Sequence, residues 1–187
     1  MNKLIISVIL TTVTGMVFGQ DRRGQVYESE LKNVIKINPL SLILTNISVS
    51  YERIITDRIG IQLQAGYWIG GNIGNTKWSG ISLTPEFRYY LTNQERPKGL
   101  YLAAFARYQE IQAEIQDSNS EWAVSRIGGG VSVGYQMLLG QRVAWDIFLG
   151  PQYLVNSGSK DEISTADYGQ FIGSFGLRLG TTLGVAF

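Results

Sequence analysis

The chain ends in the stretch SFGLRLGTTLGVAF, residues Ser174–Phe187. Counted back from Phe187 in steps of two, the side chains are apolar except for Thr181. The side chains between them are small or hydroxylated, apart from Arg178. Alternation with a period of two is the signature of a β-strand with one apolar face. The sequence therefore predicts a final strand whose apolar face must meet an apolar environment.

The same alternation recurs along the chain, and convincing helical periodicity is absent. In the stretch Ile59–Trp68, for example, Leu63 and Tyr67 share one face, while Gln62 and Gln64 share the other. We expect an all-β chain of eight antiparallel strands. Their approximate bounds are Asn33–Leu40, Ile47–Ile55, Ile59–Trp68, Ile81–Leu91, Leu100–Ile111, Arg126–Met137, Val143–Gln152 and Tyr168–Phe187.

The predicted connections alternate in length. Tight or modest turns fall at Thr56–Arg58, Thr92–Lys98 and Gly140–Arg142. Longer loops rich in glycine, serine and acidic residues fall at Gly70–Lys77, Ala113–Glu121 and Asn156–Asp167. Short turns at one end and long loops at the other are typical of an up-and-down barrel in an outer membrane. The first connection on the long-loop side, LSLILTN (Leu40–Asn46), is short and unusually apolar.

The composition restricts the function. The 187 residues suit one domain, and the formal net charge of +1 does not indicate a nucleic-acid partner. Charged residues make up 17% of the chain, against about 25% in an average soluble domain. There is no cysteine and no histidine, which removes disulfides, thiolate chemistry and the usual general base. We therefore expect no enzyme, no cofactor and no metal site, and we read the acidic loop residues as solvated.

The N-terminus has the pattern of a secretory signal peptide. Lys3 precedes an apolar run that extends to about Phe18, and the small residues Val17 and Gly19 precede a cut before Gln20. A transmembrane anchor is the alternative, but the run is shorter than the ~20 residues that a spanning helix needs. The predicted organisation is a signal peptide at residues 1–19, an N-terminal segment at 20–32 and a barrel at 33–187.

The polar faces of the strands indicate which side is outside. They carry glycine, serine, threonine and glutamine, with isolated charges near mid-strand. A soluble barrel of the lipocalin type would also alternate, but its polar face would carry charges scattered along every strand. Isolated charges suit a narrow interior where they pair with one another. The sequence therefore predicts a lumen polar network of Glu52, Glu86, Arg88, Arg107, Arg126, Asp146 and Arg178.

Aromatic residues on the apolar faces cluster at two heights. Such bands are typical of the interfacial girdles of a membrane barrel. The predicted girdle residues are Tyr89, Tyr135 and Trp145 toward the short turns, and Trp78, Trp122 and Tyr153 toward the long loops.

From Val34 to Phe187 the chain resembles the small eight-stranded outer-membrane barrels of the OmpA/OmpX type. Within them it looks most like outer-membrane β-barrel proteins filed under a domain of unknown function. The stretches that carry the resemblance are NISVSYERIITDRIGIQLQAGYW, SLTPEFRYYL, GLYLAAFARY and LRLGTTLGVAF. The resemblance implies that the terminal Phe187 is the signal by which the barrel assembly machinery recognises the chain for insertion.

Together these features predict a non-enzymatic transmembrane β-barrel in the outer membrane of a Gram-negative bacterium. Its expected role is structural or surface-interacting through extracellular loops, as a monomer in contact with outer-membrane lipid and lipopolysaccharide, with an extracellular ligand left open. A low-conductance pore for small solutes or ions is the second hypothesis. A secreted, soluble, lipocalin-like carrier is the third.

The signal-peptide prediction can be checked directly. Because the apolar run of residues 4–18 ends at small residues before Gln20, we expect the exported protein to begin at or next to Gln20. N-terminal sequencing of protein extracted from membranes measures this. Recovery of Met1 as the first residue would contradict the prediction.

Overall fold

The structure, a computed structural model, describes residues 31–43, 45–69, 72–73, 76–91, 98–115, 120–140, 142–160 and 175–187. The predicted signal peptide lies outside the described residues, and so do most of the predicted N-terminal segment and residues 161–174. No helix in the described ranges is long and apolar enough to cross a membrane.

Nearly all the described residues are in β-strands. The elements are β1 (Asn33–Ile37), α2 (Pro39–Ile43), β2 (Asn46–Thr56), β3 (Ile59–Trp68), β4 (Asn72–Ile73), β5 (Thr76–Tyr90), β6 (Gly99–Ile115), β7 (Ser120–Leu139), β8 (Val143–Lys160) and β9 (Phe175–Ala186).

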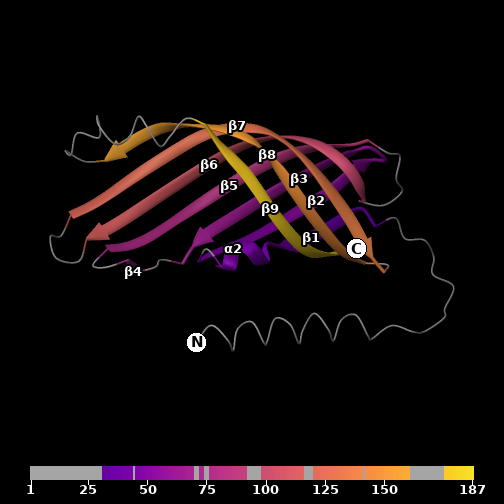
Figure 1. The fold of residues 1–187 in the computed structure, drawn as a ribbon, viewed down its shortest axis with the longest axis horizontal. Coiled ribbons are helices and arrows are strands. Elements are labelled where there is room, and N and C mark those ends of the chain that lie inside the picture. The colour runs from indigo at the N-terminus through magenta and orange to yellow at the C-terminus, as the bar shows by residue number, and fades with distance from the viewer. Residues whose placement is uncertain are drawn as a thin grey trace, which may run out of the picture.

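Eight of the strands form a closed antiparallel barrel (Figure 1). Each wall strand pairs with the next along the chain, and β3 pairs directly with β5 because the two-residue β4 only adds to β5. The barrel closes where β9 pairs with β1, with Val34 opposite Ala186 and Ile37 opposite Leu183. The prediction of an eight-stranded, antiparallel, up-and-down barrel is confirmed.

Several strands are longer than their alternation predicted. The predicted loop Ala113–Glu121 lies largely within β6 and β7, whose pairing reaches Ile115 and Ser120. Likewise β8 extends to Lys160, into the predicted loop Asn156–Asp167. Antiparallel pairing satisfies the backbone whatever the side chains are, so polar residues continue these strands beyond the apolar band.

β1 is shorter than predicted, because the chain turns at Asn38 and Pro39. Proline lacks the N–H that a strand ladder needs but suits the first turn of a helix. The Asn38 side chain accepts a hydrogen bond from the backbone N–H of Ser41 (3.1 Å), which caps α2. The apolar first connection is therefore a short capped helix.

Helix α2 contacts both β2 and β9 beside the short β1. Residues 183–186 of β9 pair with β1, whereas residues 175–182 pair only with β8. Leu40 on α2 is exposed, as the outward apolar residues of the strands are. The apolar character of this connection therefore matches its place in the barrel wall.

The distribution of polar residues is inverted relative to a soluble protein. Leu63, Leu83 and Leu149 point outward and are 45–47% exposed. On the opposite face of the strands, Glu52, Arg88, Asp146 and other polar side chains are fully or almost fully buried. In soluble proteins, by contrast, most charged side chains lie on the surface, and those that are fully buried are paired. The lumen of this barrel is the polar region, and its outer wall is apolar.

Candidate functional site in the barrel lumen

The short-turn half of the lumen contains a cluster of buried charges, here called the lumen cluster. Its members come from β1, β2, β5, β8 and β9, so residues far apart in the sequence meet across the barrel. Three cations face three carboxylates, and their formal charges cancel. The lumen cluster consists of Lys36, Arg88, Arg178, Glu52, Glu86 and Asp146.

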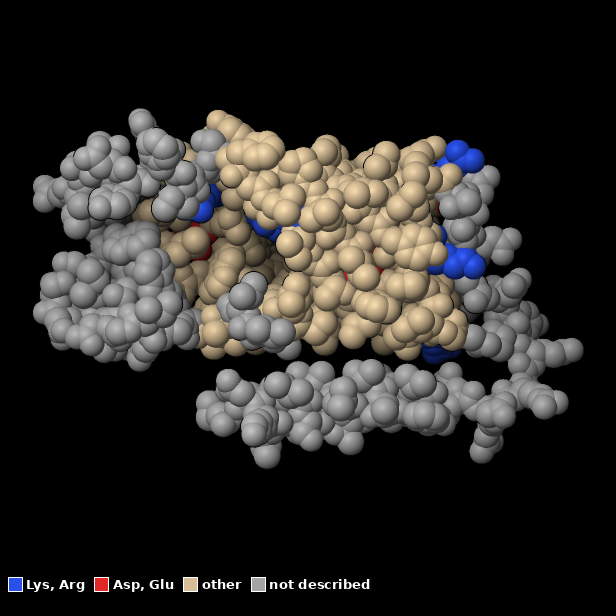
Figure 2. Space-filling model, in the orientation of Figure 1, with Lys and Arg blue, Asp and Glu red and all other residues tan. Residues whose placement is uncertain are grey.

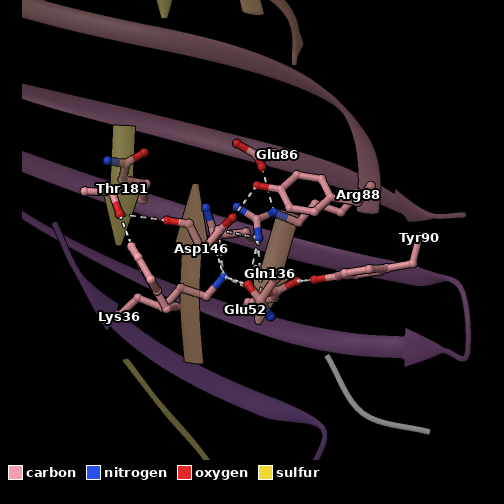
Figure 3. Close-up of polar contacts among 12 residues, drawn as sticks. Lys36, Glu52, Glu86, Arg88, Tyr90, Gln136, Asp146 and Thr181 are labelled. Carbon is pink, nitrogen blue, oxygen red and sulfur yellow. Dashed lines mark hydrogen bonds and ion pairs between the residues drawn. The ribbon is translucent and has the colours of Figure 1, made fainter. Parts of the chain in front are cut away.

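Lys36 joins the two sides of the lumen cluster (Figure 3). Its Nζ lies 2.5 Å from Glu52 Oε2 and 3.3 Å from Asp146 Oδ2. The same ammonium donates hydrogen bonds to the side-chain carbonyl oxygens of Gln62 and Gln136. A fully buried lysine is strongly destabilising unless it is paired. Here the ammonium has partners from four different strands, β2, β3, β7 and β8.

Arg88 bridges all three carboxylates. Its Nε donates to Glu86 (2.7 Å), and one terminal nitrogen donates to Asp146 (2.8 Å) and lies 3.4 Å from Glu52. The guanidinium also stacks over the ring of Tyr101, 4.3 Å from the ring centroid. Arginine suits this position because its planar group bonds to carboxylates and stacks on an aromatic face at the same time.

Two tyrosine hydroxyls complete the hydrogen bonding of the carboxylates. Tyr90 donates to the second oxygen of Glu52 (2.6 Å), and Tyr101 donates to the second oxygen of Asp146 (2.8 Å). Both rings are buried, and their centroids lie 5.5 Å apart. Glu52 and Asp146 therefore each have cations at one oxygen and a hydroxyl at the other, which offsets the loss of water on burial.

Arg178 closes the lumen cluster toward the long-loop end. It forms an ion pair with Glu86 (2.5 Å) and donates to Gln64 (3.0 Å). Its guanidinium carbon also lies 4.4 Å from the ring centroids of both Phe105 and Phe148. The two rings add cation–π attraction to the ion pair.

The other two predicted arginines lie apart from this cluster. Arg107 donates to Thr84 (3.2 Å) and Gln152 (3.0 Å), both of which are neutral. The Arg126 Nε is shielded from solvent and has no hydrogen-bond partner within the described ranges. The structure thus brings together five of the seven predicted lumen residues and leaves these two nearer the long loops.

Sequence reasoning did not include Lys36 in the lumen set, although the signal was present. Ile35 and Ile37 flank it on a strand and point outward, which turns Lys36 inward. Tyr90 and Tyr101 are absent from the predicted lumen network, although the alternation places both on the polar faces of their strands. Only the closed barrel shows that their hydroxyls meet Glu52 and Asp146.

Three of the six predicted girdle residues lie exposed on the outer wall. Tyr89, Tyr135 and Tyr153 are exposed on the outer face. Trp145 is half-buried and donates from its indole N–H to Thr181 Oγ1 (2.7 Å). The side chains of Trp78 and Trp122 lie outside the described part of the structure.

The terminal residue is part of the closed sheet. Phe187 exchanges two backbone hydrogen bonds with Asn33, at 2.8 and 3.0 Å, and its ring is exposed on the outer face. The free end of the chain is therefore held beside the start of β1, with its side chain outward at the short-turn end.

The lumen cluster is an arrangement of buried, mutually paired side chains. The cations and carboxylates of the lumen cluster are paired, and the described ranges contain no group of three or more acidic residues placed to hold a metal ion. An eight-stranded barrel has an interior just wide enough for side chains to fill. The side chains of the lumen cluster therefore occupy the interior of the short-turn half of the barrel.

Comparison with known protein families identifies the family to which the chain belongs. The family model with the description "Protein of unknown function (DUF3575)" matches residues 5–174. This confirms the resemblance to a family of unknown function. No curated protein matches the chain.

A solved structure is also similar, the crystal structure of Neisserial surface protein A (NspA). The sequence identity is 14% and the TM-score is 0.49, and the match covers 83% of this chain and 95% of that chain. This likeness is too distant to support an inference about activity.

The lumen cluster leads to a prediction about stability. Replacing Glu86→Gln removes the carboxylate shared by Arg88 and Arg178, so a buried guanidinium loses its counter-charge. We expect the free energy of unfolding to fall by about 3–5 kcal/mol. Urea unfolding of the barrel in lipid vesicles measures the change.

A double variant provides the control. Glu86→Gln combined with Arg178→Met removes both charges and keeps a long side chain between Phe105 and Phe148. It should be more stable than Glu86→Gln alone, because the uncompensated charge is gone. A Glu86→Gln variant as stable as the wild type would show that the pairing has no energetic role.

Proposed function

We propose that this chain, which belongs to the family described as "Protein of unknown function (DUF3575)", spans the outer membrane of a Gram-negative bacterium as a closed barrel. Its role is structural or surface-interacting through the long-loop end. The lumen is blocked, and the protein is not an enzyme.

The apolar outer wall is the observation that carries this proposal. Each of the eight wall strands carries large, apolar, exposed residues on its outer face. Figure 2 shows one face of the wall with hardly any charged atoms between its two ends. A surface of this kind is unfavourable in water but suits the hydrocarbon of a bilayer. Closure through β1 and β9 supports the same environment, because lipid cannot satisfy an open edge.

The outer membrane is the membrane that accounts for both the fold and the N-terminus. The predicted signal peptide directs export, and antiparallel barrels with an even number of strands are the outer-membrane type of spanning structure. We further propose that the exposed ring of Phe187 is read by the barrel assembly machinery, which inserts the chain as a monomer.

The blocked lumen favours a surface role over a pore. The lumen cluster spans the interior from β1 and β2 to β5, β8 and β9. The strands β6, β7 and β8 continue beyond the apolar band toward the long loops. That end offers polar surface to lipopolysaccharide headgroups or to an extracellular ligand. A low-conductance pore remains the second candidate, since the lumen is lined by polar groups.

The membrane assignment leads to a prediction about Leu83, which lies midway along β5 and is 45% exposed. Replacing Leu83→Arg should lower the free energy of unfolding in lipid vesicles by ~2–4 kcal/mol, because the charge would lie in hydrocarbon. Urea titration measures it.

The matched control is Leu139→Arg, at an exposed apolar position where β7 meets its short turn. Its expected cost is only about 0–1 kcal/mol, because the position lies near the interface. If both substitutions proved equally harmless, the outer wall would not face lipid, and a soluble carrier would become the better hypothesis.

The choice between scaffold and pore leads to a prediction about conductance. Wild-type protein in a planar bilayer should show no steady channel current, because charged side chains fill the lumen. The Glu86→Gln variant is the comparison, since it loosens the pairing at Arg88 and Arg178. Regular single-channel steps from the wild type, at a level that Glu86→Gln alters, would establish the pore instead.

A further inference from the structure

The lumen cluster is balanced, but the lumen as a whole is not. Within the described ranges, Arg107 and Arg126 are two further cations on the inner face of β6 and β7, and no carboxylate lies within ion-pair distance of either. The long-loop half of the described lumen therefore has a surplus of positive charge.

The two arginines are neighbours. Arg107 is in register with Gly128, and Arg126 is in register with Gln109, so they occupy a diagonal pair on adjacent strands. Such pairs have Cα atoms about 7–8 Å apart, within reach of two long side chains that converge on one small group. The hydrogen-bond acceptors that Arg107 uses, on Thr84 and Gln152, are neutral and leave its charge uncompensated.

Arg107 is also held close to a third cation. The guanidinium carbon of Arg107 lies 5.9 Å from the ring centroid of Phe105, and that of Arg178 lies 4.4 Å from the same ring. Like charges in a partly buried region repel each other more strongly than in water. Arg178 has Glu86 as its counter-ion, whereas Arg107 has none in the described structure. An anion beside Arg107 would offset the repulsion from Arg178.

The lumen has room for a ligand at this height. Gly176, on the inner face of β9, lies opposite Gln152, which accepts a hydrogen bond from Arg107. A Cβ at Gly176 would meet only the side chain of Gln152, at 3.5 Å. Near the long-loop end, Figure 2 shows a hollow in the described surface, with Lys or Arg atoms in it and Asp or Glu atoms beside it.

We propose that Arg107 and Arg126 form a binding site for a phosphate-bearing anion in the long-loop half of the lumen. Guanidinium groups bind phosphate oxygens through paired N–H donors, and two of them can share one tetrahedral group. Gln152 lies beside the site as a neutral polar group. The anion is either a free phosphate compound or the headgroup of a lipid, since both present the same oxygens.

The test uses the full mature chain, folded in a non-ionic detergent that carries no phosphate. Calorimetry follows titration with inorganic phosphate and pyrophosphate in one arm, and with short-chain phosphatidic acid in the other. We expect saturable binding in at least one arm. Binding of the free anions assigns a soluble ligand, and binding of phosphatidic acid alone assigns a lipid headgroup.

Two variants locate the site. Arg107→Gln and Arg126→Gln should each weaken binding about tenfold or more, because each removes charge-assisted hydrogen bonds. The matched control is Arg142→Gln, at an exposed position in the turn between β7 and β8, which should bind like the wild type. Heat-modifiable migration on gels confirms that every variant is folded.

A stability measurement separates this site from a structural role of the arginines. Without anion, Arg107→Gln should be at least as resistant to urea as the wild type, because it relieves repulsion with Arg178. Added anion should raise the unfolding midpoint of the wild type but not of Arg107→Gln. The proposal is overturned if no probe binds the wild type, or if folded Arg107→Gln and Arg126→Gln bind as tightly as Arg142→Gln.

Discussion

Closure of the sheet between β9 and β1 is the constraint on which the rest of this structure depends. The short β1 pairs with Leu183–Ala186 on one side and with β2 on the other, so that the wall has no free edge along β1. Once the sheet is closed, every strand has one face outside and one face inside. The apolar alternate residues then form the outer wall, and the polar residues that alternate with them lie in the lumen.

The lumen is consequently crowded with groups that are expensive to bury. Six charged side chains from five strands form one neutral cluster, and the hydroxyls of Tyr90 and Tyr101 complete the bonding of Glu52 and Asp146. Glycines on the inner face, such as Gly134 against the Tyr101 ring and Gly180 against the Phe148 ring, leave room for large side chains. The same arrangement that makes the burial tolerable also fills the passage.

The two halves of the lumen differ in charge and therefore in what they can do. The short-turn half is paired within itself and suits a permanent structural block. The long-loop half carries Arg107 and Arg126 without described counter-charges, on the side where β6 and β7 extend beyond the apolar band. A protein that used its lumen only as a filled core would gain nothing from this asymmetry. A binding function at the long-loop end accounts for it.

The class of fold and the direction of most side chains follow from the amino-acid sequence without the structure. A period of two, an apolar face on every strand and alternating connection lengths are local properties, so the barrel and its inner and outer faces followed from them. The order of strands followed as well, because short turns force neighbours to pair. Charged residues on inner faces, such as Glu86 and Arg178, were identified for the same reason.

The tertiary structure alone decided which of those charges meet. Cross-lumen partners such as Lys36 and Asp146 are 110 positions apart, and their contact depends on strand stagger, which alternation does not encode. It also decided that Arg107 has neutral partners and that Leu40–Ile43 form part of a helix beside β9. Side-chain direction is a local property of a strand, whereas height and distance in a lumen are properties of the closed barrel.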